Sequence, residues 1–215
     1  MSERIISLIR EATTETFYMV FWSTLFSVVL GFIPAIILNI TARDGLHPNK
    51  IVYGILDFLV NVFRSFPFVI LMVIVIPFTR MIAGKAIGTR AAIVPLTISA
   101  IPFVARVMES ALRSVDPGVI EAARSFGASN AQIIFRVEIK EAVPAIISGI
   151  TLTIINLVGY SAMGGAIGAG GLGDVAIRYG YQQYNMPTLI VTSLILIVFV
   201  QGIQLIGNKL FDKLS

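Results

Sequence analysis

The sequence contains no cysteine and only one histidine, and these absences exclude several kinds of site. Without cysteine the chain forms no disulfide and no thiolate metal centre, and its redox compartment stays undetermined. His47 stands beside Pro48 in a short polar stretch. A zinc site needs three or four ligands, so His47 is better interpreted as a solvated loop residue than as a metal ligand. We therefore expect neither a metal nor a cofactor in this chain.

Charged residues are also scarce in this sequence. Only 13% of the 215 residues are charged, whereas 56% are hydrophobic, and soluble domains usually carry about a quarter charged residues. The mean hydropathy of +0.89 agrees. Such a chain cannot hide its apolar surface inside a water-facing shell, so the bilayer is the expected solvent. The net charge of +4 comes from basic residues scattered between apolar runs, which is typical of membrane flanks rather than of nucleic-acid binding.

Apolar runs of membrane-spanning length predict an all-α bundle of five transmembrane helices. The clearest run, residues 17–40, has no charge and as a helix would reach about 36 Å, enough to cross a hydrocarbon core of about 30 Å. A second span near 51–79 is interrupted by Asp57 and Arg64, and Pro67 should bend it. The other spans are predicted at about 91–105, from Ala142 into the glycine-rich residues 164–173, and at 187–207.

The N-terminal residues and the charges between spans leave two questions open. Residues 4–16 have helical amphipathic spacing, which predicts either an interfacial helix or an extension of the first span. Five spans place the termini on opposite sides. Most basic residues lie inside if the C-terminus is cytosolic, but Arg80, Lys85 and Arg90 then lie outside, against the usual rule.

Residues 106–141 form the longest polar stretch, and they carry helix-capping signals. Asp116 suits an N-cap, Pro117 suits the first helical position, and Gly127 suits a C′ residue with positive φ. Ser129 and Gln132 have the spacing of a capping box. The stretch therefore predicts a helix-turn-helix with a glycine corner.

Two roles fit this polar stretch on physical grounds. Its apolar positions are expected to share one side of each short helix, namely Val119, Ile120, Ala123 and Phe126 on the first and Ile133, Ile134 and Val137 on the second. DNA contact is disfavoured because Glu121, Glu138 and Glu141 accompany only a few basic residues. The open alternatives are a linker that packs on its own bundle and a docking surface for a partner.

The segment Asp116–Ala128, DPGVIEAARSFGA, resembles the E-A-A…G cytosolic loop of type I ABC importer permeases. Arg64–Phe68 and Leu157–Gly173 are similar to methionine-importer permeases in particular, and the likeness covers most of residues 13–207. The resemblance implies a permease domain over 13–207 with a coupling loop at about 114–141. Residues 1–12 then form an amphipathic N-terminal segment, and 208–215 a cytosolic tail.

The same resemblance implies that the loop docks in a groove of a separate ATPase subunit. The residues it assigns to this coupling are Asp116, Pro117, Glu121, Ala122, Ala123, Arg124 and Gly127. The implied partners are an ATPase homodimer that binds ATP and Mg, a second copy of this chain, and a periplasmic or lipoprotein substrate-binding protein. The implied location is the bacterial inner membrane, with the N-terminus outside and the C-terminus cytosolic.

The loop departs from the family pattern at one place. The family commonly has an apolar-x-Leu-Pro ending, whereas this chain has Val137–Lys140 there and Pro144 four residues later. Without the proline at position 140, a more continuous helix into the fourth span is expected. The docking surface itself does not depend on this position.

One glycine pattern could be mistaken for a nucleotide-binding site. Gly168-x-Gly170-x-x-Gly173 fits a dinucleotide fingerprint, but it follows a predicted membrane helix rather than a strand. Tight turns and close helix approach explain these glycines better. No Walker A sequence occurs, so the chain is not expected to hydrolyse ATP or to be an enzyme.

Polar residues at membrane depth are candidates for the translocation path or its gate, because they need a partner or a wet cavity. These candidates are Asn61, Asn156, Tyr160, Ser161 and Met163. Asn156 suits an interhelical hydrogen bond better than substrate contact. Met163 is interpreted either as a soft plug at a dimer axis or as plain packing. The candidate helix bends or hinges are Pro67, Gly164 and Gly165.

The resulting functional hypothesis is alternating-access import of methionine, in its L- and D-forms, driven by the ATPase. An alternative keeps this role for another small amino acid or related solute. A passive channel or secondary transporter would explain the spans but not the capped loop. An intramembrane enzyme is disfavoured because the sequence offers no histidine pair and no clear carboxylate dyad at membrane depth.

Overall fold

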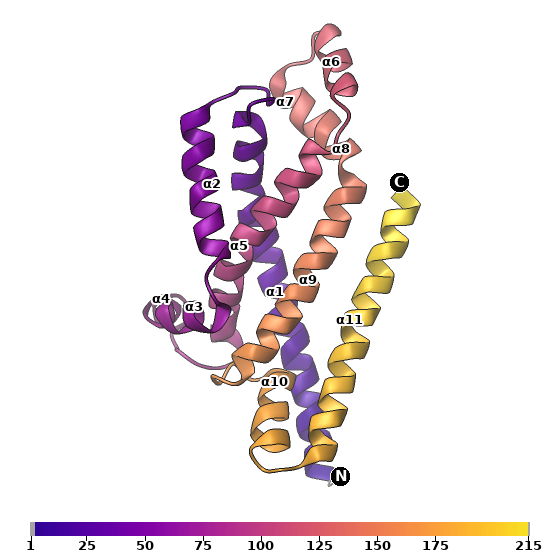
Figure 1. The fold of residues 1–215 in the computed structure, drawn as a ribbon. Coiled ribbons are helices and arrows are strands. Elements are labelled where there is room, and N and C mark those ends of the chain that lie inside the picture. The colour runs from indigo at the N-terminus through magenta and orange to yellow at the C-terminus, as the bar shows by residue number, and fades with distance from the viewer. Residues whose placement is uncertain (1–2, 215) are drawn as a thin grey trace.

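The computed structural model describes residues 3–214, and within them it contains helices and no strand (Figure 1). The predicted all-α fold is confirmed. The elements are α1 (Glu3–Thr41), α2 (Lys50–Arg64), α3 (Phe68–Ile74), α4 (Ile76–Ala83), α5 (Thr89–Arg113), α6 (Pro117–Ser125), α7 (Asn130–Gln132), the π-helix η1 (Ile133–Glu138), α8 (Ile139–Glu141), α9 (Val143–Gly165), α10 (Gly171–Val175), the π-helix η2 (Ala176–Tyr181) and α11 (Met186–Leu214).

Among the described residues, four helices are long and apolar enough to cross a membrane, namely α1, α5, α9 and α11. The bent pair of α2 and α3 supplies a fifth candidate. The prediction of a third span at 91–105 was too short, since α5 continues to Arg113. Arg106 and Glu109, which the sequence placed in a loop, are helical and form an ion pair with each other at 2.8 Å.

The second predicted span is not one straight helix. The axes of α2 and α3 differ by 100°, so the bend expected at Pro67 is confirmed, and it divides the span predicted near 51–79 into separate helices. Pro67 takes the N-cap position of α3 in an extended conformation, because its ring lacks an N–H and restricts the residue before it. The 15 residues of α2 reach only about 22 Å, short of a hydrocarbon core of about 30 Å.

The N-terminal segment is the beginning of α1. This helix runs without a break from Glu3 to Thr41, so residues 4–16 extend the first span and do not form a separate interfacial helix. The reason lies in packing. Ile9 and Ala12 are buried in one cluster with Leu172 and Val175, so α10 covers the face that the sequence suggested for the membrane surface.

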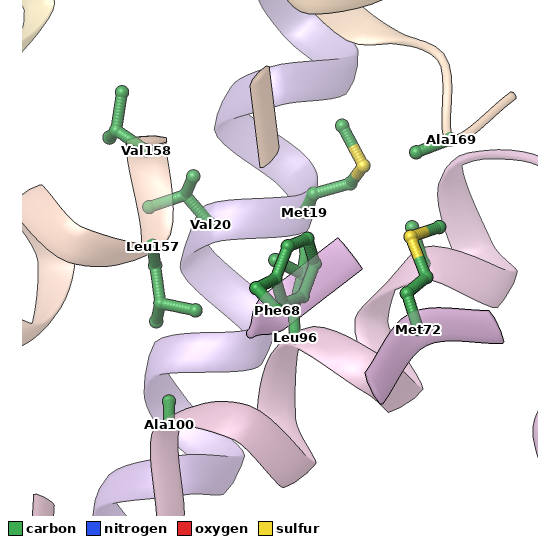
Figure 2. Packing of buried hydrophobic residues seen from close by; sticks show 10 residues of the cluster. Met19, Val20, Phe68, Met72, Leu96, Ala100, Leu157, Val158 and Ala169 are labelled. Atoms are coloured by element: carbon green, nitrogen blue, oxygen red, sulfur yellow. The ribbon is translucent and has the colours of Figure 1, made fainter. Parts of the chain in front are cut away.

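The central core joins four helices and one turn. Figure 2 shows buried side chains of α1, α3, α5 and α9 pointing toward one another, with Ala169 from the turn after α9 closing one side. Because α3 contributes Phe68 and Met72 to this core, the bent segment is packed into the bundle. The ring of Phe68 stacks on Tyr160 of α9 with centroids 4.8 Å apart.

Glycines let α5 approach its two main neighbours closely. A Cβ atom on Gly31 of α1 would lie 2.7 Å from the Cβ of Val104, and one on Gly149 of α9 would lie 2.5 Å from Val107. Contacts under 3.0 Å are not tolerated without a shift of backbone or side chain. Close backbone approach at small residues is the usual way that membrane helices associate, because lipid provides no hydrophobic drive between them.

We expect Gly31→Ala to destabilise the fold by about 1–3 kcal/mol, because the added methyl overpacks the seam between α1 and α5. The matched control is Gly54→Ala on α2, where an added Cβ meets nothing within 4 Å. That control should be neutral or stabilising by up to about 1 kcal/mol. Thermal unfolding midpoints in detergent measure both, and equal midpoints would contradict the close approach.

Candidate functional site

Helix α6 begins and ends with the signals that the sequence predicted. Asp116 is its N-cap, and its Oδ1 accepts a hydrogen bond of 2.7 Å from the backbone N–H of Gly118. Pro117 takes the first position. Gly127 follows the helix with a φ of +79°, where glycine carries no steric cost. The corner between α6 and α7 is therefore fixed by local chemistry.

The capping box at the start of α7 is also confirmed. The backbone N–H of Ser129 donates to Oε1 of Gln132 at 2.8 Å, and the Ser129 Oγ accepts from the backbone N–H of Gln132. Two donors at the helix start are satisfied in this way. The second short helix starts where the sequence predicted.

Helix α6 faces solvent along most of its length, since none of its residues is buried. Glu121, Ala122 and Arg124 are exposed, and Ala123 is half-buried. The expectation of one apolar side was only partly right, because Val119 is exposed and the ring of Phe126 is 91% exposed. The Phe126 ring therefore adds exposed apolar surface at the tip of a capped helix.

One contact anchors α6 to the bundle. Ile120 packs against a cluster that contains Leu112, Val115 and Ala142. These residues lie at the end of α5, just after it, and just before α9. The residues predicted to couple to an ATPase therefore project from a base that rests on two long helices.

The segment after Arg136 follows the expected departure from the family pattern. Helices α7, η1 and α8 succeed one another directly, and α9 begins at Val143 with Pro144 in its first turn. Lys140 is exposed on α8, so the more continuous helix predicted there is confirmed. The widened turns of η1 were not predicted, and π-helical turns are frequent at functional sites.

Glu138 is the buried polar residue of this segment, and sequence reasoning did not assign it a role. Only 4% of the residue is exposed. Its Oε2 accepts a hydrogen bond of 2.9 Å from Nδ2 of Asn39, near the end of α1. Burial raises the pKa of the Glu138 carboxyl, and the hydrogen bond from Asn39 partly opposes that rise. This pair ties α1 to the coupling segment.

A cavity of about 170 Å³ lies behind α6. Its walls include Asn39 and Glu138, the Arg113 side chain, and Glu121 and Arg124 of the coupling motif. The exposed motif and the buried pair therefore border the same polar space. We find that Glu121 and Arg124 face this cavity at its edge while staying open to solvent.

A network of charges joins α2 to α5 in the half of the bundle that leads to α6. Arg106 contacts Asp57, pairs with Glu109 at 2.8 Å, and donates at 3.1 Å to Oδ1 of Asn61. Tyr53 donates to the same Glu109 at 3.1 Å. Only 3% of the Glu109 side chain is exposed, so these partners keep a buried charge satisfied.

The network continues to the turn between α1 and α2. Arg113 pairs with Asp44 at 2.9 Å and lies 3.7 Å from Glu109. The sequence flagged Asp57 only as an interruption of a span, and it assigned Arg106 and Arg113 to a loop. The available signal was the i, i+3 and i, i+4 spacing of Arg106, Glu109 and Arg113, which favours ion pairs on one helical face.

The candidate pathway residues fall into different surroundings. Asn61 is held in the network by Arg106. Ser161 is buried and donates to the carbonyl of Val158 at 2.8 Å, while Tyr160 stacks on Phe68. The Asn156 side chain is half-buried, and no interhelical hydrogen bond is found for it within residues 3–214. The roles of these residues in a path stay predictions.

Met163 differs from the other candidates because it is half exposed near the end of α9. The adjoining Gly164 and Gly165 are buried. A Cβ on Gly165 would lie 2.2 Å from the backbone N of Asp174, and one on Gly173 would lie 2.2 Å from the carbonyl oxygen of Ala162. Close approach of α9 and α10 is confirmed, and the hinge role of Gly164 and Gly165 stays a prediction.

The glycine run that follows α9 forms turns. Gly168, Gly170 and Gly171 have positive φ values, and an α-helix precedes them where a dinucleotide fold would need a strand. Side chains of α1 complete the turn. Glu15 Oε2 accepts from the backbone N–H of Gly171 at 2.7 Å, and Thr16 Oγ1 accepts from that of Leu172 at 2.9 Å.

The buried Glu138 predicts a pH dependence of stability. Burial raises its pKa in the folded chain, so folding favours the protonated form. The resulting stabilisation is complete below the unfolded-state pKa, about 4.3, and is lost as the pH rises through the folded-state value. Glu138→Gln keeps an acceptor for Asn39 and removes the titration, so its thermal midpoint should vary less with pH across this window.

The matched control for this prediction is Glu141→Gln, which changes an exposed carboxyl on the neighbouring helix α8. This variant should follow the parent profile of midpoint against pH. If Glu138→Gln and the parent had the same profile, burial of the Glu138 carboxyl would not govern the dependence.

Comparison with known proteins places these features in a family. A family model described as the inner membrane component of binding-protein-dependent transport systems matches residues 27–211. A probable D-methionine transport system permease protein of Vibrio cholerae is 50% identical over 208 residues, covering 97% of this chain and 92% of that protein. The methionine import system permease protein of Bacillus subtilis is 46% identical over 205 residues, covering 94% and 92%.

Solved structures agree with the sequence relatives. An inward-facing structure of the MetNI methionine ABC transporter matches with a TM-score of 0.98 and 43% identity over 100% of both chains. An amino acid ABC transporter solved with histidines has a TM-score of 0.80 at 21% identity, covering 98% and 95%, and shares the fold. This chain belongs to the family of inner membrane components of binding-protein-dependent transport systems.

Proposed function

We propose that this chain is the permease subunit of an ATP-driven importer of methionine, in its L- and D-forms. The observation that carries the proposal is α6, a capped helix whose coupling residues stand in solvent above two long helices. The substrate is supported by relatives that are named as methionine permeases and that match nearly the full chain at 46–50% identity. Another small amino acid is the second candidate.

The energy source we propose is an ATPase homodimer that docks on α6, on the surface that includes Glu121, Arg124 and Phe126. The exposed ring of Phe126 supports a partner with an apolar groove. ATP and Mg would bind that partner, since this chain contains no Walker A sequence. A second copy of this chain would complete the path, and a substrate-binding protein would deliver methionine to it.

The arrangement of the chain ends supports an orientation. In Figure 1 the C-terminus and α6 lie toward one end of the bundle, and the N-terminus lies with α10 at the other. If an ATPase docks on α6, that end is cytosolic. The N-terminus and α10 would then face the outside of the inner membrane, where a binding protein would dock.

The contacts around α6 suggest how its motion would reach the membrane. Ile120 bears on residues next to α5 and α9, and Glu138 is bonded to Asn39 of α1. The pairs of Arg106 carry the connection to α2. A displacement of α6 by closing ATPase subunits would thus move the cytosolic ends of four helices together, which is the rigid-body type of switching.

The similarity to the MetNI transporter also suggests to which side of the membrane the path is open. The matching MetNI structure is described as inward-facing, so we propose that the conformation of this chain is that of an inward-facing permease. Outward opening would then require ATP binding by the partner, because only an interaction that differs between two states shifts their populations.

Uptake by reconstituted vesicles tests the function. Vesicles that contain this chain, its ATPase and its binding protein should accumulate labelled methionine only with ATP inside, and unlabelled methionine should compete better than histidine or glutamine. Accumulation of another amino acid would replace the substrate and keep the permease role. Uptake without ATP or ATPase would instead indicate a channel or secondary transporter.

We expect Glu121→Lys and Gly127→Val to lose ATP-driven uptake by at least about tenfold. The first reverses a charge on the docking surface, and the second places a β-branched residue at a φ of +79°. Co-purification with the ATPase should fall in parallel. Glu11→Lys, which reverses an exposed charge on α1 near the other end, should leave both unchanged. Normal uptake and co-purification in the α6 variants would contradict the docking role.

Met163→Ala tests the gate. If the half-exposed Met163 side chain plugs the path, its truncation should raise passive leak of methionine and change basal ATPase activity. Met81→Ala, which truncates an exposed methionine on α4, is the control. Identical leak and ATPase activity in Met163→Ala and the parent would leave Met163 as a packing residue.

A further inference from the structure

An apolar groove of about 640 Å³ runs along the outside of the bundle between α1, α4 and α5. It is unconnected with the coupling site. Aliphatic and aromatic side chains line nearly all of it, and its few polar groups include Arg90 and the Tyr18 hydroxyl. The lining residues are contributed by α1 from Tyr18 to Leu30 and by α5 from Arg90 to Ile101.

The groove has a direction and a length that suit a lipid chain. Helices α1 and α5 run the same way, since Met19 of α1 clusters with Ala92 of α5, and further along both helices Ala35 clusters with Met108. Tyr18 and Arg90 therefore mark one end, and Leu30 and Ile101 mark the other. A helix rises about 17 Å between residues that are eleven or twelve positions apart, as these end residues are, and this is close to half of a hydrocarbon core of about 30 Å. The groove thus has the depth of one leaflet.

Aromatic residues place the Tyr18 end at the membrane surface. Tyr18 contacts the edge of Trp22, and Trp22 stacks on Phe26, with centroids 6.4 and 5.6 Å apart. Tyrosine and tryptophan gather at the headgroup level of membranes because their rings are amphipathic. The polar end of the groove is therefore where phospholipid headgroups lie.

Three basic residues at this end are exposed and form no ion pair among the described residues, 3–214. They are Arg80, Lys85 and Arg90. In the proposed orientation they also lie on the outer side, where basic residues are normally depleted. A phosphate group would compensate this charge, as anionic lipids do for basic clusters at membrane surfaces.

We propose that this groove binds one anionic phospholipid, with an acyl chain along α1 and α5 and the phosphate at Arg90. The apolar walls select an acyl chain, and the unpaired guanidinium selects a headgroup with net negative charge. The Tyr18 hydroxyl lies at the same end and can donate to the phosphate or glycerol oxygens. This site does not depend on which solute is transported.

Native mass spectrometry of the full-length chain, with whichever subunits co-purify from detergent, tests the selectivity. The probes are palmitoyl-oleoyl phosphatidylglycerol and the matching phosphatidylethanolamine. Phosphatidylglycerol should be retained preferentially, and Arg90→Gln should weaken its retention about fivefold. Ile98→Trp, which fills the groove without a change of charge, should weaken it at least as much.

The control Arg10→Gln removes an exposed arginine near the same end of α1, outside the groove, and should retain phosphatidylglycerol like the parent. Equal retention of both lipids by the parent would overturn the proposal. So would equal losses in Arg10→Gln and Arg90→Gln, because they would indicate attraction to net charge alone.

A second copy of the chain is the competing occupant, and a label inside the groove distinguishes it. The chain has no cysteine, so a fluorophore attached to the full-length variant Val94→Cys reports on one place. In nanodiscs, brominated phosphatidylglycerol should quench this label more strongly than brominated phosphatidylethanolamine. A label that neither lipid quenches would show that protein covers the groove, and the lipid site would be wrong.

Discussion

The close seam between α1 and α5 is the constraint on which the rest of the structure depends. It is made possible by Gly31, whose missing side chain lets α1 lie against the Ile101 carbonyl oxygen and the Val104 side chain of α5. With these two parallel helices fixed, one end of the pair presents Asn39 to the coupling segment, and the other end forms the groove with α4. Both functional surfaces are thus placed by one packing contact in the membrane.

Buried polar groups connect the helices around this seam and determine how a movement of one helix affects the others. Glu109 and Glu138 are buried carboxylates, and each is bonded across helices, to Tyr53 of α2 and to Asn39 of α1. Removing one partner of such a pair leaves a buried charge or acceptor unsatisfied, which is expensive in low dielectric. The helices are therefore expected to adopt discrete arrangements rather than a continuous range, and a displacement of α6 can shift them from one arrangement to another.

Local features could be predicted from the sequence, and tertiary ones could not. The caps at Asp116, Gly127 and Ser129 depend on neighbours within three residues, and all were found in place. The pairing of Arg106 with Asp57, 49 positions apart, depends on how α2 and α5 pack. The length of α5 was missed because its charges resembled a loop, although partners within the helix, on α2 and in the turn before α2 satisfy them. The 100° break at Pro67 follows from a local signal, but its size depends on the core around Phe68.

The chain has few charged residues. Those with a partner in the protein stabilise its fold, whereas those without one are available to contact another molecule. Several charges with partners lie in the network of α2, α5 and the turn at Asp44, where they hold helices together, and Arg178 pairs with Asp174 at 3.0 Å beside α10. Among the charges for which no ion pair is found in residues 3–214 are Glu121 and Arg124 on α6 and the three basic residues of the 80–90 connection, and all five are exposed. An unpaired charge beside lipid is costly unless water, a protein or a headgroup meets it. The same need to compensate exposed charge therefore supports a protein partner at α6 and a lipid phosphate at Arg90.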